Sequence, residues 1–212
     1  MNRVLLAVEL VVAVVAALSV HGWAQAFVAG RFGDPSPARW GRRTLDPRRG
    51  LDRFGTLVLP GLGILLAVSG TASAPVFAYG APMPLDESRL GWRRSVASLL
   101  AGPLADVVLA AVAGAGVRAF GTVSTVGRAA AVVVWVAASM AVIQCMPVPG
   151  LDGARALRWA LPPRAAATYA DLDQYLPLFL IVLFFVLGGT FLGIVGNLTS
   201  ALCSALAGPG VC

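Results

Sequence analysis

The chain has 212 residues, of which 58% are hydrophobic and only 12% are charged, and its formal net charge is +6. Soluble domains carry charge on about a quarter of their residues, so this composition excludes an ordinary soluble domain and predicts a polytopic membrane protein. All 16 basic residues are arginines. Because no stretch interleaves basic and aromatic residues on a soluble face, the arginine excess indicates membrane topology and argues against nucleic acid as a partner.

Five apolar stretches predict an all-α protein, with residues 1–212 forming a single membrane-embedded domain. We expect five to six transmembrane or re-entrant segments, because each long stretch approaches the length that spans a bilayer. The expected helices cover residues 4–30, 56–68, 95–117, 129–146 and 176–196. The first stretch begins like a signal peptide, but its apolar character continues to Val28 without a cleavage site, so we expect a retained helix.

The arginines predict how these segments cross the membrane. Residues 31–55 contain seven arginines and three aspartates, which places this loop in the cytoplasm and the N-terminus outside. Further arginines at 89–94 and 155–164 fall on the same side. Residues 56–90 must then leave the cytoplasmic side and return to it, although this segment contains one apolar stretch and not two. Extended backbone at membrane depth needs protein or water to satisfy its amides, so we expect a cavity beside residues 74–86. The alternative is that the arginine bias misleads for this loop.

Ionisable residues inside membrane spans are candidates for function. The chain has four: Glu9, His21, Asp106 and Asp152. Topology places His21 and Asp152 at a similar depth, where they can share a metal ion or a hydrogen bond. For each there is also a purely structural interpretation. His21 can bond a neighbouring helix, and Asp152 can cap the helix that follows it.

Five short motifs occur in order between residues 15 and 165. They are HGWAQAFVAGRFGDPSP (21–37), GRRTLDPRRGLDRFGTLVLP (41–60), FAYGAPMPLDESRL (77–90), SLLAGPLADVVLA (98–110) and QCMPVPGLDGARAL (144–157). Together they resemble the site-2 protease family of intramembrane zinc metalloproteases, and in particular its compact bacterial branch without a PDZ domain. Five motifs in order, at family-like separations, are far more specific than any one of them.

The resemblance implies a three-helix core. It also implies a zinc-dependent protease that carries out regulated intramembrane proteolysis. Two histidines of the first span and the aspartate of L-D-G would hold the metal, with a glutamate after the first histidine as general base. Here His21 and Asp152 match the first and third ligands, whereas Gln25 stands at the second ligand position and Gly22 at the base position. Two supporting asparagines of the family are also replaced, by Asp106 and Gln144.

These replacements affect the chemistry directly. A neutral amide oxygen is a poor zinc ligand beside imidazole, and Gly22 has no side chain to accept a proton. Glu9 lies 12 residues before His21, about 18 Å along a helix, and is too far to substitute. Asp106 lies on another span and remains a candidate surrogate. Gly22 also makes the helix thin, which favours a neighbour that fills the former site.

We therefore expect a catalytically inactive, site-2-protease-like membrane protein that binds or regulates transmembrane segments of client proteins. Its segment at 78–85 would pair with an extended client peptide. The alternative is an active intramembrane zinc metalloendopeptidase that uses His21, Asp152 and Asp106 in an atypical site. A small transporter is disfavoured, because no inverted repeat is visible and buried charges are few.

Overall fold

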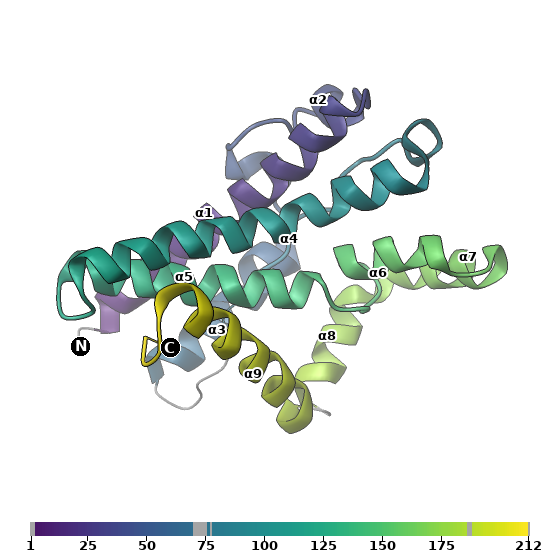
Figure 1. The fold of residues 1–212 in the computed structure, drawn as a ribbon. Helices are drawn as coiled ribbons and strands as arrows, with labels where there is room; N and C mark the ends of the chain where they lie inside the picture. The colour runs from purple at the N-terminus through teal and green to yellow at the C-terminus, as the bar shows by residue number, and fades with distance from the viewer. Residues whose placement is uncertain (1–2, 70–75, 77, 186–187, 212) are drawn as a thin grey trace.

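The computed structural model describes residues 3–69, 76, 78–185 and 188–211 (Figure 1). Within these residues the chain forms helices and no strands. The elements are α1 (Arg3–Arg31), α2 (Ser36–Arg39), η1 (Pro47–Gly50), η2 (Arg53–Val58), α3 (Leu59–Ser69), α4 (Glu87–Phe120), α5 (Thr125–Gln144), α6 (Asp152–Leu157), η3 (Arg158–Ala160), α7 (Pro163–Asp171), η4 (Leu172–Tyr175), α8 (Leu176–Phe185) and α9 (Gly188–Ala207).

Three long helices, α1, α4 and α5, pack against one another and form the centre of the molecule (Figure 1). Helix α9 lies against α4 and α5. In the described part of the chain these four helices are the ones long and apolar enough to cross a membrane. The spans expected at 4–30, 95–117 and 129–146 are confirmed as α1, α4 and α5, and the all-α membrane architecture is confirmed with them.

The expected span at 176–196 is wrong in its boundaries. Helix α8 ends at Phe185, α9 begins at Gly188, and the segment of span length is 189–207. Each glycine in a helix costs about 1 kcal/mol relative to alanine, so the Gly188–Gly189 pair is a poor helix interior. The stretch after this pair is helical because it packs against α4 and α5. Its Cys203 and Ala207 are buried in a cluster shared with those two helices.

The second apolar stretch forms a shorter helical segment. A π-helical turn, η2, leads into α3, and the apolar helix at 53–65 is shorter than a membrane span. Residues 70–75 and 77 lie outside the described residues. Whether residues 56–90 cross the membrane or re-enter it therefore stays a prediction.

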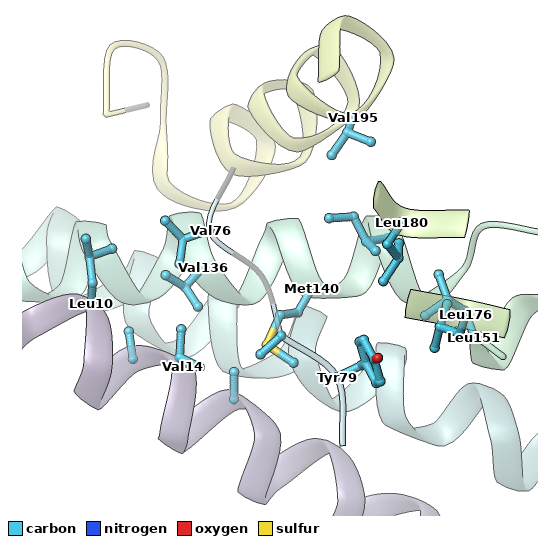
Figure 2. Close-up of a cluster of buried hydrophobic side chains, with 14 of the residues drawn as sticks. Leu10, Val14, Val76, Tyr79, Val136, Met140, Leu151, Leu176, Leu180 and Val195 are labelled. Atoms are coloured by element: carbon cyan, nitrogen blue, oxygen red, sulfur yellow. The ribbon is translucent and has the colours of Figure 1, made fainter. Parts of the chain in front are cut away.

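The main hydrophobic core joins these elements around the extended segment that precedes α4. Side chains of α1, α5, α8 and α9 meet there with Val76 and Tyr79 (Figure 2). The labelled members are Leu10, Val14, Val76, Tyr79, Val136, Met140, Leu151, Leu176, Leu180 and Val195. Val76, Ala78 and Tyr79 are thus packed into the protein, which fixes the start of the segment at 80–86.

Two glycines determine the shape of α4. Gly91 has φ +68° and interrupts the helix after its first turn, and Gly121 has φ +69° and ends it. Both lie in the left-handed region that residues with a Cβ rarely adopt. Asp86 begins α4, since its carboxylate accepts a hydrogen bond from the backbone N–H of Arg89.

Candidate functional site

The candidate site centres on His21 of α1, a residue with 6% of its surface exposed. Its ring contacts carboxylates from two other elements. Nδ1 lies 2.7 Å from Oδ2 of Asp106 in α4, and Nε2 lies 2.8 Å from Oδ2 of Asp152 in the first turn of α6. The imidazole therefore joins α1 to both α4 and α6, and His21 meets Asp152 as their similar depth predicts.

The two contacts of the ring determine how many protons the cluster holds. An ionised carboxylate only accepts hydrogen bonds, whereas a neutral imidazole has one donor and one acceptor nitrogen. Hydrogen bonds at both nitrogens therefore require a doubly protonated ring or a proton on one aspartate. Asp106 is fully buried, and its other oxygen, Oδ1, has no hydrogen-bond partner among the described residues. The cluster is thus an enclosed carboxylate–imidazole–carboxylate group.

Gln25 lies one turn after His21 and faces the same way, because residues at i and i+4 share a helix face. Its amide nitrogen donates to Oδ2 of Asp152 at 2.8 Å and to the carbonyl oxygen of Leu99 at 3.0 Å. An amide has two N–H donors, and both are used here. Turning the amide over would bring its oxygen against the Leu99 carbonyl oxygen, two acceptors facing each other. Leu99 therefore holds Gln25 with its donor side toward Asp152.

Gly102 explains why the A-G-P motif occurs beside the site. A Cβ at this position would lie 2.4 Å from Nε2 of His21, closer than any real Cβ contact. The backbone of α4 can approach the imidazole only because residue 102 has no side chain. One turn later, on the same face of α4, Asp106 reaches the other ring nitrogen.

A small pocket, about 60 Å³ in volume, lies beside His21 and Gly22, and residues 79–83 form part of its wall. A Cβ at Gly22 would meet Cε of Met83 at 3.9 Å, which is ordinary van der Waals contact. Met83 thus covers the position, but it leaves room for a side chain there. The pocket agrees with the cavity expected beside residues 74–86, although residues 74, 75 and 77 lie outside the described residues.

Segment 79–83 is held from one side by the polypeptide around η1 and η2. The N–H of Tyr79 donates to the carbonyl of Gly55 at 3.1 Å, and the N–H of Ala81 donates to the carbonyl of Gly50 at 2.9 Å. Burial, with the Asp52 carboxylate adding to it, raises the pKa of Tyr79 above its usual value. The phenol consequently stays protonated at neutral pH.

Side chains from three other regions hold the same segment. Arg42 donates to the carbonyl of Ala81 at 2.7 Å, and Arg155 of α6 donates to the carbonyl of Met83 at 3.1 Å. Burial lowers the pKa of both guanidinium groups. At the end of the segment, the buried carboxylate of Asp34 accepts from the N–H of Asp86 at 2.8 Å. The wall of the pocket is therefore fixed in place beside the His21 cluster.

Several predicted site residues make contacts that differ from those expected of them. Asp152 does not cap its helix, because its Oδ2 is taken by His21 and Gln25. Gln144 is buried and lines the pocket. Glu9 is remote from the cluster and pairs instead with Arg128 at the start of α5, at 3.0 Å.

Sequence reasoning missed the residues that set the orientation of the cluster. The Leu99 carbonyl is a backbone group, so the residue type at position 99 does not predict its contact with Gln25. Arg42 and Arg155 belong to the five motifs, but from the sequence alone we interpret them only as arginines that set the membrane topology. Gly102 had a visible signal, since a glycine one turn before Asp106 allows a close approach of two helices.

The donor set does not fit the three-ligand zinc site of the family. Catalytic zinc needs three protein ligands and an open position. At Nε2 of His21 the neighbouring carboxylate is Asp152, whereas Asp106 contacts the opposite ring nitrogen. Gln25 presents N–H groups, which cannot coordinate a metal. In the part of the chain that the structure describes, no group of three or more His, Cys, Asp or Glu side chains is placed to hold a metal ion.

Comparison with known proteins places these motifs in a family. The chain is 36% identical over 182 residues to the "Putative zinc metalloprotease Rip2" of Mycobacterium tuberculosis H37Rv, covering 84% of this chain and 68% of that protein. It is 28% identical over 187 residues to the "Putative zinc metalloprotease YwhC" of Bacillus subtilis, covering 82% and 79%.

Two other comparisons gave no match, neither to a family model nor to a solved structure. The likeness to Rip2 spans more than two thirds of both chains. The chain therefore belongs to the site-2-protease-like family, whose curated relatives are named as zinc metalloproteases.

Proposed function

We propose that this chain is a catalytically inactive member of its family, which binds or regulates other membrane proteins without cleaving them. The orientation of Gln25 carries the proposal. Its two N–H groups bond Asp152 and the Leu99 carbonyl, so the second ligand position of the family is occupied by a hydrogen-bond donor. A donor at this position stabilises a carboxylate and repels a cation.

Besides the second ligand, the general base of the family has no counterpart at its expected position. Hydrolysis by a metal-bound water needs a group that accepts its proton, and loss of a general base commonly costs a factor of roughly 10²–10⁴ in rate. Gly22 supplies no such group. Asp106 is fully buried and bonded to the far side of the His21 ring. It is therefore remote from the Nε2 side, where a water would have to react.

The binding half of the proposal rests on the pocket wall. Residues 79–83 form no helix, bend at Ala81, and are held by Gly50, Gly55, Arg42 and Arg155. Tyr79 and Ala81 direct their backbone groups toward these partners. The backbone groups of Gly80, which lies between them, make none of these hydrogen bonds. An extended client peptide pairing with that edge would gain main-chain hydrogen bonds without ordering the wall first.

Metal analysis of the purified protein tests the inactive state. We expect no stoichiometric zinc in the wild type after equilibration with zinc and gel filtration. Zinc that is present at one ion per chain and is lost in both His21→Ala and Asp152→Ala would support the active, atypical protease instead. Circular dichroism of each variant checks that loss of zinc is not loss of the fold.

Site-specific crosslinking tests the binding role. A photo-reactive residue at the exposed Pro82 should give discrete adducts with a membrane-spanning polypeptide in cells. The matched control is the same residue at Val112, which is 67% exposed on α4 and faces away from the pocket. Adducts with lipid alone at both positions would count against client binding while leaving the inactive state untouched.

A further inference from the structure

The arginine-rich connection between α1 and α3 has an unusual charge arrangement. Six of its seven arginines are exposed, and we call them the basic rim: Arg31, Arg39, Arg43, Arg48, Arg49 and Arg53. In the described part of the chain none of these arginines lies within 4 Å of a carboxylate, although four other arginines do. The rim is therefore a surface of unneutralised positive charge.

The acidic residues of the same connection are used elsewhere. Asp34 is buried and accepts from the backbone N–H groups of Ser36 and Asp86. Asp46 accepts from the N–H of Arg48, and Asp52 accepts from the N–H of Gly55. Each carboxylate thus caps a turn or joins two segments. The fold brings three negative charges close to the rim but directs each of them at the backbone.

Large apolar side chains are exposed among these arginines. Trp40 is 74% exposed, and Leu45 and Leu51 are exposed by about half. In a soluble protein such side chains would be a liability, whereas at a membrane interface tryptophan is enriched because its ring is amphipathic. Arg93 stacks on the exposed ring of Trp92 just beyond Gly91 of α4. The Asp34–Asp86 hydrogen bond holds this part of the molecule beside the rim.

The length of α1 places the rim at the membrane surface. Its 29 residues extend about 44 Å at ~1.5 Å per residue, whereas the hydrocarbon core is about 30 Å thick. The end at Arg31 therefore lies at the depth of the lipid headgroups, and the rim follows directly. Arginine is suited to phosphate because its planar guanidinium offers several donors at once.

From these observations we propose that the basic rim binds the headgroups of anionic phospholipids, with Trp40 inserted between them. Binding goes beyond the topological role of the arginines, because it predicts an enrichment of anionic lipid next to this face. The inference does not rest on the proposed function, since lipid binding needs none of the side chains of the His21 cluster, although Arg49 of the rim also lines the pocket beside that cluster. Either can fail without the other.

Quenching of tryptophan fluorescence by brominated lipids tests the proposal. The full chain is reconstituted into phosphatidylcholine vesicles that contain either brominated phosphatidylglycerol or brominated phosphatidylcholine. Subtracting the signal of a Trp40→Phe variant isolates the quenching at the rim. We expect the anionic lipid to quench Trp40 several-fold more strongly at low salt, with the preference falling as salt screens the charges.

Two triple variants separate charge from structure. Replacing Arg39, Arg48 and Arg53 by glutamine should abolish most of the preference for phosphatidylglycerol, since each basic residue near an anionic surface contributes roughly a fivefold factor and three of them together exceed a several-fold preference. Replacing the same residues by lysine keeps the charge and should retain most of it. Free glycerophosphate at the same concentration should not compete. Equal quenching by both lipids in the wild type, or a preference that survives the glutamine variant, would overturn the proposal.

Discussion

Helix α1 carries two polar clusters, one buried and one partly buried, that are built in different ways. Near its C-terminal end, the ring of His21 is bonded on both sides, and Asp152 accepts from both His21 and Gln25. Near its N-terminal end, Glu9 makes one ion pair with Arg128 at 3.0 Å. In that pair Oε2 of Glu9 and Nε of Arg128 are buried, and neither has a hydrogen-bond partner among the described residues.

The difference shows how shared hydrogen-bond partners can give a polar cluster a structural role. In the His21 cluster the side chains share partners, so the loss of His21 or Asp152 affects two other side chains at once. The Glu9–Arg128 pair is isolated, and its arginine is about one-third exposed, so water or lipid headgroups can replace a lost partner. We therefore expect substitutions in the first cluster to cost much more stability than substitutions in the second.

The largest effect is expected for His21→Ala. Without the imidazole, Asp106 is buried without its donor, and Asp152 keeps the donor of Gln25 but loses that of His21. Removing one partner of a buried charged group costs about 3–5 kcal/mol in the free energy of unfolding. Unfolding in detergent, followed by circular dichroism, measures the change. A loss below about 1 kcal/mol would mean that the cluster does not hold the three helices together.

Gly102→Ala should have the next largest effect. The new methyl group would lie 2.4 Å from Nε2 of His21, so the ring or the α4 backbone has to move. Overpacking of this kind costs typically about 1–3 kcal/mol. The same unfolding measurement applies, with Gly61→Ala as a control, because a Cβ at Gly61 meets nothing within 4 Å. Equal stabilities for the two variants would contradict the close approach of α4 to His21.

A double-mutant cycle on Glu9→Gln and Arg128→Gln should give a coupling energy of about 1 kcal/mol or less. The pair is partly accessible and has one short contact, which is typical of weakly stabilising surface pairs. Coupling as large as the effect of His21→Ala would show that the two clusters of α1 are equally important for stability.

The smallest effect is expected for Gly22→Ala, which should be neutral or stabilising by about 0.5–1 kcal/mol. Alanine is the better helix former, and its methyl group would make only an ordinary contact with Met83. Clear destabilisation would indicate that Gly22 is required for packing. The glycine would then be a structural feature in its own right and not simply a lost general base.

Much of this fold was predictable because hydrophobic length and motif order are properties of the chain itself. Apolar stretches predicted the three central helices, α1, α4 and α5. The motifs predicted that His21 would meet Asp152. The extent of α9 to Ala207 was missed, since it depends on where this helix finds a surface to pack against. Glu9 was a candidate without a partner, because the sequence does not say which helix Arg128 would meet.

The orientation of Gln25 could not be predicted from its residue type. A glutamine offers both an acceptor and two donors, and only the position of the Leu99 carbonyl decides which of them faces Asp152. Similarly, Asp106 was a candidate surrogate ligand, but which ring nitrogen it contacts depends on the close approach that Gly102 allows. Both features depend on backbone positions created by helix packing.

The most direct test of the inactive state is the zinc content of the wild type beside that of a Gly22→Glu/Gln25→His double variant. A Cβ at residue 22 would make only an ordinary contact with Met83, and the second histidine would face the same way as His21. After equilibration with zinc and gel filtration, our account predicts no stoichiometric zinc in the wild type and a gain toward one ion per chain in the variant. Stoichiometric zinc in the wild type, lost on Asp152→Asn, would contradict it.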